Sequence, residues 1–396
     1  MSTFTLLRNG EVFAPEPCGL ADILIAGQQI AAVGRDLPSL SSYGATEIDL
    51  RGRRVIPGLI DGHAHITGGG GEAGYETRVP PVPLSEFTRG GITTVVGLLG
   101  TDDVVRTPGQ VVAAAYALRA EGLSAYCYTG GYHVPPATVT GSVRGDIVHI
   151  DPVIGVGEVA ISDHRSSQPT RDEILRLAGD THVAGLMTSK AGVLHLHLGD
   201  GERGLAIVRD CLDASEIPAR VFQPTHVNRR RALFAEALQL AADGCNIDVT
   251  AFPEEDLPVD GEELPATAAL LSYLDADLPH DRITVSTDGG GCLPTFNADG
   301  RVASIDVGRP NALALALQKL LAQGAGLDRV LPAFTSNVAG LLRLPGKGAV
   351  SAGACADLVV LGDDHSVEDV WARGQRHVDA GRPILFGAFE RVRNIE

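Results

Sequence analysis

The sequence predicts an α/β fold: a TIM-like (β/α)8 barrel with a small β-sandwich domain built from both ends of the chain. Eight short aliphatic runs alternate with helical stretches through the middle of the sequence, the pattern of parallel strands joined by crossover helices. Hydrophobic residues make up 44% of the 396 residues but aromatic residues only 5%, which suits the continuous aliphatic strands of a buried parallel sheet. A chain of this length exceeds the usual size of a single core, so one large unit and one smaller unit are expected.

The two ends of the chain contain short strand-like runs. Residues 3–15 hold two such runs around an Asn-Gly pair, a strong hairpin signal. Residues 367–383 have the same style, with tight turns at Ala-Arg-Gly and Asp-Ala-Gly. We therefore expect a small β domain from residues 1–55 and 346–396, and a barrel from residues 56–345.

The middle of the chain provides strands and helices in turn. Eight units of this kind over about 290 residues match the size of a (β/α)8 barrel. The expected strands are 53–61, 92–100, 124–130, 152–161, 193–199, 219–226, 245–252 and 282–289. The helical stretches between them include 109–122, 171–180, 203–215, 230–244 and 309–325.

The composition argues against several classes of function. A net charge of −17 disfavours nucleic acid as a partner, because nucleic-acid binding needs a basic surface. The same charge means that an anionic substrate must be held by a local group of arginines. No apolar run approaches the ~20 residues of a membrane span, and the N-terminus lacks the basic-then-apolar order of a signal peptide. The six cysteines form no CxxC pair, so we expect a cytoplasmic protein with reduced thiols.

Residue types that bind metals recur, one or two at a time, where the expected strands end. In a barrel of parallel strands, all of these positions meet at one rim. Imidazoles and carboxylates gathered there form a site for borderline divalent metals, zinc above all. The residues are His63, His65, Glu158, His197, His226 and Asp288.

Each of these residues also has an ordinary structural explanation. A single histidine at a strand end is more often part of the core, and an aspartate before two glycines, such as Asp288, is usually a turn residue. The pair His63 and His65 gains weight from its setting, since alternating side chains place both rings on one face at the end of the first barrel strand. His195 points the same way as His197 but one layer deeper, so we interpret it as core. Asp288 could instead bind a metal and transfer a proton.

The order of these residues resembles the amidohydrolase superfamily. Its pattern is a His-x-His pair, an acid on strand four, two single histidines and a final aspartate, with a segment like Ala-Asp-Leu-Val-Val-Leu near the end. Further motifs resemble the isoaspartyl dipeptidases of that superfamily, and the run Gly-Gly-Gly-Gly-Glu-Ala-Gly with Leu-Leu-Gly-Thr-Asp is specific to them. These motifs lie at 68–74, 95–102, 129–135, 140–143, 161–166 and 224–229.

The resemblance implies a two-zinc hydrolase that cleaves β-aspartyl dipeptides with metal-activated water. In that family the histidine pair, here His63 and His65, holds one zinc ion. The two later histidines, here His197 and His226, hold the second. The strand-eight aspartate, here Asp288, binds metal and acts as general acid and base.

The resemblance also assigns residues to the substrate. Glu72 would bind its free α-amino group, and Tyr132 would polarise the scissile carbonyl. Arg165 and Arg229 would bind its carboxylates, and Thr101 would line the pocket. A β-aspartyl dipeptide carries one ammonium and two carboxylates, so one glutamate and two arginines supply complementary charges. Without the resemblance, Glu72 would be interpreted as a solvated loop acid and Arg165 as half of a structural ion pair.

One departure from the family pattern concerns the bridge between the metals. Well-known members use a carboxylated lysine on strand four, but residues 152–161 contain no lysine. Glu158 lies at or beside that position, so we expect its two oxygens to bridge the ions, with a bulge at Gly155 and Gly157 that brings it closer. The alternative is a single metal with Glu158 paired to Arg165, but a buried glutamate without a cation would be costly. Lys190 precedes strand five in a loop and is a poor candidate for the carbamate.

A second departure is Cys292, where a small polar residue such as serine is expected near the substrate carboxylate. A thiol is a weaker hydrogen-bond donor, so the change affects fine specificity.

The alternatives to a β-aspartyl dipeptidase are another amidohydrolase, such as an N-acyl-D-amino-acid deacylase or a cyclic-amide hydrolase, and a non-enzymatic scaffold paralogue. Glu72 argues against the first, because those substrates lack a free α-amino group, and the retained metal ligands argue against the second. The resemblance further implies a homo-oligomer, with an octamer as the candidate assembly.

Overall fold

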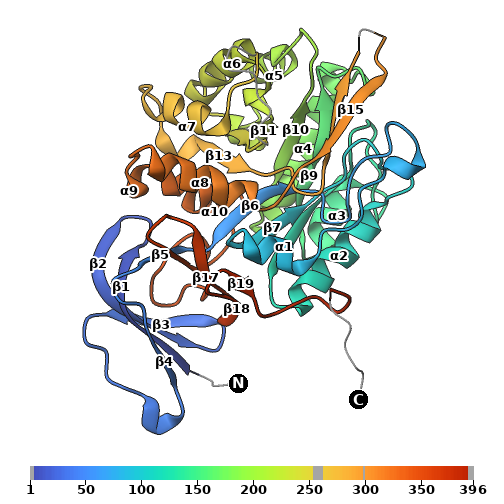
Figure 1. Ribbon diagram of the computed structural model, residues 1–396. Helices are drawn as coiled ribbons and strands as arrows, with labels where there is room; N and C mark the ends of the chain where they lie inside the picture. The colour runs from blue at the N-terminus through green and yellow to red at the C-terminus, as the bar shows by residue number, and fades with distance from the viewer. Residues whose placement is uncertain (1–3, 253–261, 298, 391–396) are drawn as a thin grey trace.

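A curled parallel sheet lies at the centre of the molecule, flanked by helices (Figure 1). The computed structural model describes residues 4–252, 262–297 and 299–390. The central strands are β6 (Leu59–Ala64), β7 (Ile92–Gly97), β8 (Ser124–Thr129), β9 (Val153–Ile161), β10 (Val193–Leu198), β11 (Phe222–Thr225), β12 (Ile247–Thr250) and β13 (Ile283–Ser286). Strands β6 to β11 form one six-stranded parallel sheet in chain order, and β12 and β13 form a parallel pair. Each of the eight predicted strands overlaps one of these.

The first and last of the eight strands meet where they end. The backbone amide of Asp288, two residues after β13, donates to the carbonyl of His63 in β6 at 3.1 Å. The amide of His65 donates in return to the carbonyl of Gly289 at 2.8 Å. The carboxyl ends of β6 and β13 therefore lie side by side, and the residues that follow them face a common space.

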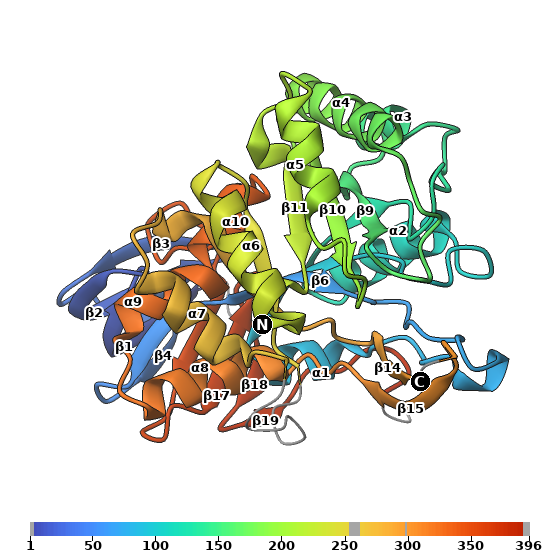
Figure 2. The same cartoon turned by 90° about the horizontal axis from the view of Figure 1, so that it is seen from above.

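Helices occupy the connections between the strands, and α3, α4 and α5 cover the outer side of β9 to β11 (Figure 2). Each of the five predicted helical stretches contains a helix, but α4 continues well beyond the predicted end at residue 180. Buried Thr181 and Ala184 continue its inward face, and it ends at Ser189 in a left-handed conformation. The helices are α1 (Leu84–Arg89), α2 (Pro108–Ala120), α3 (Val143–His149), α4 (Arg171–Thr188), α5 (Ala206–Asp213), α6 (Arg231–Ala242), α7 (Ala266–Leu274), α8 (Ala312–Ala322), α9 (Leu327–Val330) and α10 (Ser336–Leu341).

Strands from both ends of the chain form a second, nine-stranded sheet. Its members are β1 (Phe4–Phe13), β2 (Pro17–Ala26), β3 (Gln29–Gly34), β4 (Thr46–Asp49), β5 (Arg54–Pro57), β16 (Leu358–Leu361), β17 (Val367–Ala372), β18 (Gln375–Asp379) and β19 (Arg382–Pro383). Strand β16 pairs antiparallel with β5, so the two ends of the chain are in direct contact. A separate hydrophobic core that includes Trp371 packs against this sheet. The predicted division at residues 55 and 346 stays a prediction, and residues 1–3 and 391–396 of that domain lie outside the described residues.

Two local features differ from the predicted strands. The predicted strand 53–61 is divided at Gly58 between the two sheets, because the Gly58 amide bonds to Asp357 and the next amide to Gly91. An antiparallel hairpin of β14 (Cys292–Phe296) and β15 (Val302–Val307), which was not predicted, follows β13. Strand β14 is mostly half-buried and β15 mostly exposed, so they lack the buried apolar pattern used to find the others.

None of the helices in the described part of the chain has the length and apolar character required to cross a membrane.

Candidate metal centre and active site

The first group of candidate metal ligands combines the end of β6 with the end of β13. His63 lies in β6, His65 directly after it, and all three side chains of His63, His65 and Asp288 are buried. One carboxylate oxygen of Asp288, Oδ1, is 3.0 Å from Nε2 of His65 and 3.4 Å from Nε2 of His63. Asp288 has a left-handed backbone with φ of 53°, an unusual conformation that functional sites often hold.

Glu158 lies between this group and a second one. Its Oε1 is 3.4 Å from Nε2 of His65, whereas its Oε2 is 3.4 Å from Nε2 of His226 and 2.9 Å from Nδ1 of His197. Oε2 is also 3.7 Å from Nε2 of His63. The two oxygens of one carboxylate therefore face different sets of histidines, an arrangement compatible with a bridging ligand.

A bulge in β9 places Glu158 at this point. Leu194 and Leu196 of β10 pair with Val156 and Val159 of β9, so three steps on β9 match two on β10. The bulge occurs at the predicted glycine, Gly157, where a Cβ atom would lie 2.7 Å from the Cβ of His195. Only a glycine allows the two strands to approach this closely.

The other two histidines lie at the ends of β10 and β11. His226 follows β11 with φ of 60°, and its Nδ1 is 2.7 Å from the Thr250 hydroxyl, so that Nε2 faces Glu158. His197 has its Nε2 3.1 Å from Oδ2 of Asp163. If Nε2 carries the proton and donates to Asp163, then Nδ1 presents a lone pair toward Glu158, as a metal-binding imidazole with a carboxylate partner does.

Several candidate ligand atoms in this cluster lie close together and lack hydrogen-bond partners. The atoms of His63, His65 and Asp288 lie within 4.8 Å of one another, as do those of His63, Glu158 and His226. Among the described residues, the buried atoms Nε2 of His63, Nε2 of His226 and Oδ1 of Asp288 have no hydrogen-bond partner. Leaving such atoms unpaired is costly, and this set of nitrogen and oxygen donors fits divalent metal ions.

The electrostatics of the cluster favour ionised carboxylates. Burial raises the pKa of Glu158, but the nearby rings of His63 and His197 lower it more, so the pKa lies well below its ordinary value. The pKa of Asp288 is lowered in the same way, against its burial, by His63 and His65. Both carboxylates are therefore negative at neutral pH and can act as metal ligands.

Next to the metal ligands, Glu72 and Arg165 face the same pocket. The Thr101 hydroxyl donates to Oε1 of Glu72 at 3.0 Å, and Nη1 of Arg165 is 3.5 Å from the same oxygen. The other oxygen, Oε2, is buried without a partner among the described residues. The remaining side of Arg165 binds both oxygens of Asp163, which is the structural ion pair considered above for this arginine.

Three further predicted residues line this pocket. The Tyr132 hydroxyl is 2.9 Å from Nδ1 of His197, and burial holds the pKa of Tyr132 well above its usual value, so it stays a proton donor. Arg229 has a distant ion pair with exposed Asp200 at 3.7 Å, and its Nε is buried without a partner in the described chain. Cys292 begins β14, and burial next to Glu72 raises its pKa to about 12, so the thiol is neutral.

Two residues near the site have roles that the sequence did not suggest. His195, interpreted as core, is indeed fully buried, but its Nε2 is 2.8 Å from Nδ1 of His63. Its Nδ1 is 3.1 Å from Oε1 of Gln223, and Tyr128 stacks on its ring. Because the amide oxygen of Gln223 can only accept, His195 must accept from His63, which fixes His63 with Nε2 free for a metal.

Asp163, which the sequence offered only as an ion-pair partner of Arg165, is the second such residue. It contacts both His197 and Arg165, and so links a candidate metal ligand to a candidate substrate ligand. Lys190 lies elsewhere, as expected, since its ammonium bonds to the backbone carbonyls of Ile147 and Ile150 at 2.6 and 2.7 Å.

Comparison with known proteins places this geometry in a family. Residues 46–112 match the model of the amidohydrolase family. The crystal structure of β-aspartyl dipeptidase from Fervidobacterium islandicum AW-1 in complex with β-Asp-Leu is 38% identical, with a TM-score of 0.90, and the match covers 99% of this chain and 100% of that one. A D-hydantoinase from a Bacillus species, 17% identical with a TM-score of 0.65 over 97% of both chains, shares the fold.

Curated relatives match over a shorter stretch. Dihydroorotase from Lactobacillus leichmannii is 37% identical over 100 residues, 25% of this chain and 22% of that protein. The matched stretch thus spans about a fifth of the dihydroorotase, and it says little about substrate. The full-length match decides the family: this chain belongs to the β-aspartyl dipeptidases of the amidohydrolase family.

Proposed function

We propose that the protein is a binuclear zinc hydrolase that cleaves β-aspartyl dipeptides. The observation that carries this proposal is the pocket in which the unpartnered oxygen of Glu72 and the guanidinium of Arg165 face the candidate metal ligands. An ammonium site beside a carboxylate site and a metal site matches the charges of a β-aspartyl dipeptide. The related Fervidobacterium structure contains β-Asp-Leu, which supports the same substrate class.

Two ions would be held by residues from five strand ends, with Glu158 as the bridging ligand. His63, His65 and Asp288 would bind one ion, and His197 and His226 the other. Bound zinc ions supply a Lewis acid that polarises a carbonyl and lowers the pKa of water toward neutrality. Glu158 would take the place of a carboxylated lysine, and the bulge in β9 supports this by bringing its short side chain to both histidine groups.

Asp288 and Tyr132 would handle the charge that develops during hydrolysis. With its pKa held low, Asp288 is ionised and can accept a proton from the attacking water, then deliver it to the leaving amine. Tyr132 keeps its proton and can donate a hydrogen bond to the oxygen of the scissile carbonyl.

The substrate would be oriented by charge. Glu72 would receive the free α-amino group through Oε2, since Oε1 already accepts from Thr101. Within the described chain, Nε of Arg229 has no partner and could bind a carboxylate. Arg165 binds Asp163 and has Nη1 3.5 Å from Oε1 of Glu72, at the edge of the same pocket, where it could contact a second carboxylate. Cys292, a neutral thiol, would line the carboxylate end of the pocket.

We further infer that the eight parallel strands form the predicted (β/α)8 barrel, since β13 returns to β6 through two backbone hydrogen bonds. A homo-oligomer is part of the same proposal, on the ground of family membership alone.

The test is substrate selectivity of the zinc-loaded protein. We expect turnover of β-Asp-Leu and little turnover of N-acetyl-β-Asp-Leu, because acetylation removes the ammonium that Glu72 would bind. Glu72→Gln should lose most activity on β-Asp-Leu and keep its zinc, and Glu76→Gln, in the same loop, serves as the control. Equal turnover of the acetylated and free dipeptides would favour a deacylase, and turnover of dihydroorotate or a hydantoin instead would favour a cyclic-amide hydrolase.

A further inference from the structure

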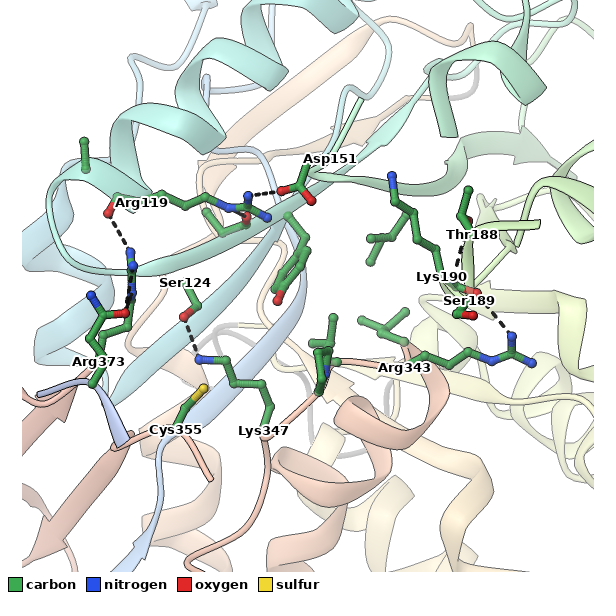
Figure 3. A pocket seen from close by; sticks show the side chains of 18 residues that line it. Arg119, Ser124, Asp151, Thr188, Ser189, Lys190, Arg343, Lys347, Cys355 and Arg373 are labelled. Atoms are coloured by element: carbon green, nitrogen blue, oxygen red, sulfur yellow. Dashed lines mark hydrogen bonds and ion pairs between the residues drawn. The ribbon is translucent and has the colours of Figure 1, made fainter. Parts of the chain in front are cut away.

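A second cavity lies at the opposite end of the parallel strands from the metal ligands. It has a volume of about 770 Å³ and is lined by the start of β8 at Ser124, the start of β9 at Ile154 and the loop before β10 at Lys190 (Figure 3). The segment 342–347 and residues of the terminal sheet close its other sides. This volume falls in the range of small-molecule sites, roughly 300–1,000 Å³.

The lining combines an apolar wall with an excess of positive charge. The apolar side chains come from Tyr126, Ile154, Leu342, Leu344 and Pro345. Five cationic side chains line the cavity, against one carboxylate, that of Asp151: Arg119, Lys190, Arg343, Lys347 and Arg373. The chain as a whole carries a net charge of −17, so this concentration of cations departs from the rest of the molecule.

Only two of the five cations have a carboxylate partner among the described residues. Arg119 pairs with Asp151, and Lys347 pairs with Asp357 and also donates to the Ser124 hydroxyl at 2.6 Å. The side chain of Lys347 is only 4% exposed, so its position is fixed.

The other three cations are bound to neutral oxygens. Lys190 uses two of its three N–H donors on backbone carbonyls, and burial lowers its pKa. Arg343 donates to the Lys190 carbonyl at 3.3 Å, and Arg373 donates to Oε1 of Gln28 and, at 2.8 Å, to the Arg119 carbonyl. Arg343 and Arg373 keep unused donors and form no ion pair with a described carboxylate, whereas Asp151 lies close enough to Lys190 to favour its charged form.

We propose that this cavity binds a small organic dianion with an aromatic or branched apolar body. Arg343 and Arg373 line opposite sides of the cavity (Figure 3), so the dianion would accept charge-assisted hydrogen bonds, which are strong, from the unused guanidinium donors of one of them. The apolar wall would cover the body of the ligand. A phosphate monoester and a dicarboxylate share this chemistry.

Isothermal titration calorimetry of the zinc-loaded protein tests the proposal with two probes, phenyl phosphate and phthalate, and with neutral benzamide as the control ligand. We expect saturable binding at one site for at least one dianion, weakened by added salt, and none for benzamide. The probe that binds identifies the source as a phosphate ester or a dicarboxylate. The double substitution Arg343→Gln with Arg373→Gln should weaken binding at least tenfold, whereas Arg176→Gln, exposed on α4 outside the cavity, should not.

The active site also contains arginines, so Arg229→Gln is measured beside these variants. Loss of binding in Arg229→Gln would assign the dianion to the active site and overturn the proposal. Absence of saturable binding for both probes, or equal affinity in the double variant, would overturn it as well. Arg343 is exposed and Arg373 half-buried, and each single substitution provides a milder variant if the double variant does not fold.

Discussion

Asp288 shows how one residue combines two requirements of the site. Its backbone bonds to β6 and holds a left-handed conformation, while Oδ1 lies between the two histidines of the first group. An asparagine keeps the size and one oxygen ligand but cannot accept a proton. We therefore predict that Asp288→Asn lowers kcat for β-Asp-Leu by about 10²–10⁴-fold, the usual contribution of a general acid or base, with zinc retained.

Steady-state kinetics and elemental analysis on the same samples measure this effect. Exposed Asp281 provides the matched control, since Asp281→Asn removes an equal charge outside the site. Near wild-type kcat in Asp288→Asn with its metals bound would show that the proton follows another route, with Tyr132 as the nearest candidate.

At the scale of elements, the bulge in β9 moves the backbone of Glu158 toward the histidines, so that its short side chain could reach both proposed metal ions. A methyl group at Gly157 would lie 2.7 Å from the Cβ of His195 and 2.8 Å from its carbonyl oxygen. Gly157→Ala must push β9 and β10 apart, so we expect a loss of stability of about 1–3 kcal/mol, the usual cost of overpacking, together with weaker zinc binding. Gly179→Ala, in α4, is the matched control. Its methyl group would meet only the side chain of Ile217, at 4.0 Å.

Chemical denaturation and zinc titration measure both quantities. Unchanged stability and zinc affinity in Gly157→Ala would mean that the close approach of β9 and β10 does not position Glu158.

Strand β18 carries a buried histidine that should make the terminal sheet sensitive to acid. His377 is fully buried with no hydrogen-bond partner for its ring among the described residues, and burial lowers its pKa from 6.5 to about 4. The folded state disfavours the protonated ring of His377. The contribution of the neutral ring to the free energy of unfolding is therefore complete above pH 6.5 and is lost as the pH falls toward 4. The difference between these values corresponds to about 3 kcal/mol.

Unfolding measured between pH 7 and 4 should therefore show a shallower loss of stability in His377→Gln than in the wild type. His149→Gln, at an exposed position in α3, should keep the wild-type slope. If the free energy of unfolding falls with pH equally in His377→Gln and the wild type, then protonation of His377 does not destabilise the folded state.

The sequence was most informative where local pattern decides the structure. The aliphatic runs gave all eight central strands, and two-residue spacing on a strand put His63 and His65 on one face. The functional assignments of Glu72 and Arg165 depended on family motifs, because a loop glutamate and an arginine beside an acid have no distinctive pattern of their own.

Features that depend on contacts between distant segments were not predictable. The bond between His195 and His63 depends on how β6 and β10 face each other, and the cationic cavity brings together residues that lie far apart in the sequence, from Gln28 to Arg373. The hairpin of β14 and β15 is too exposed for burial patterns, although Asp299 and Gly300 give a turn signal between its strands.

For the molecule as a whole, the proposed use of Glu158 in place of a lysine carbamate would change how the metal centre assembles. A carbamate must be built from carbon dioxide, whereas a glutamate is complete when the chain folds. We predict that metal-free protein regains full activity on β-Asp-Leu with zinc in buffer depleted of carbon dioxide. Reconstitution with and without added bicarbonate measures this, and a strong bicarbonate requirement would count against Glu158 as the bridge.

The most direct test of the account is a crystal structure of the zinc-loaded protein with anomalous diffraction data at the zinc edge. The account predicts two zinc peaks about 3.5–4 Å apart, as in two-metal hydrolases, with one carboxylate oxygen of Glu158 on each ion. A single zinc peak, a carboxylated lysine between the ions, or a Glu158 side chain turned away from them would contradict it.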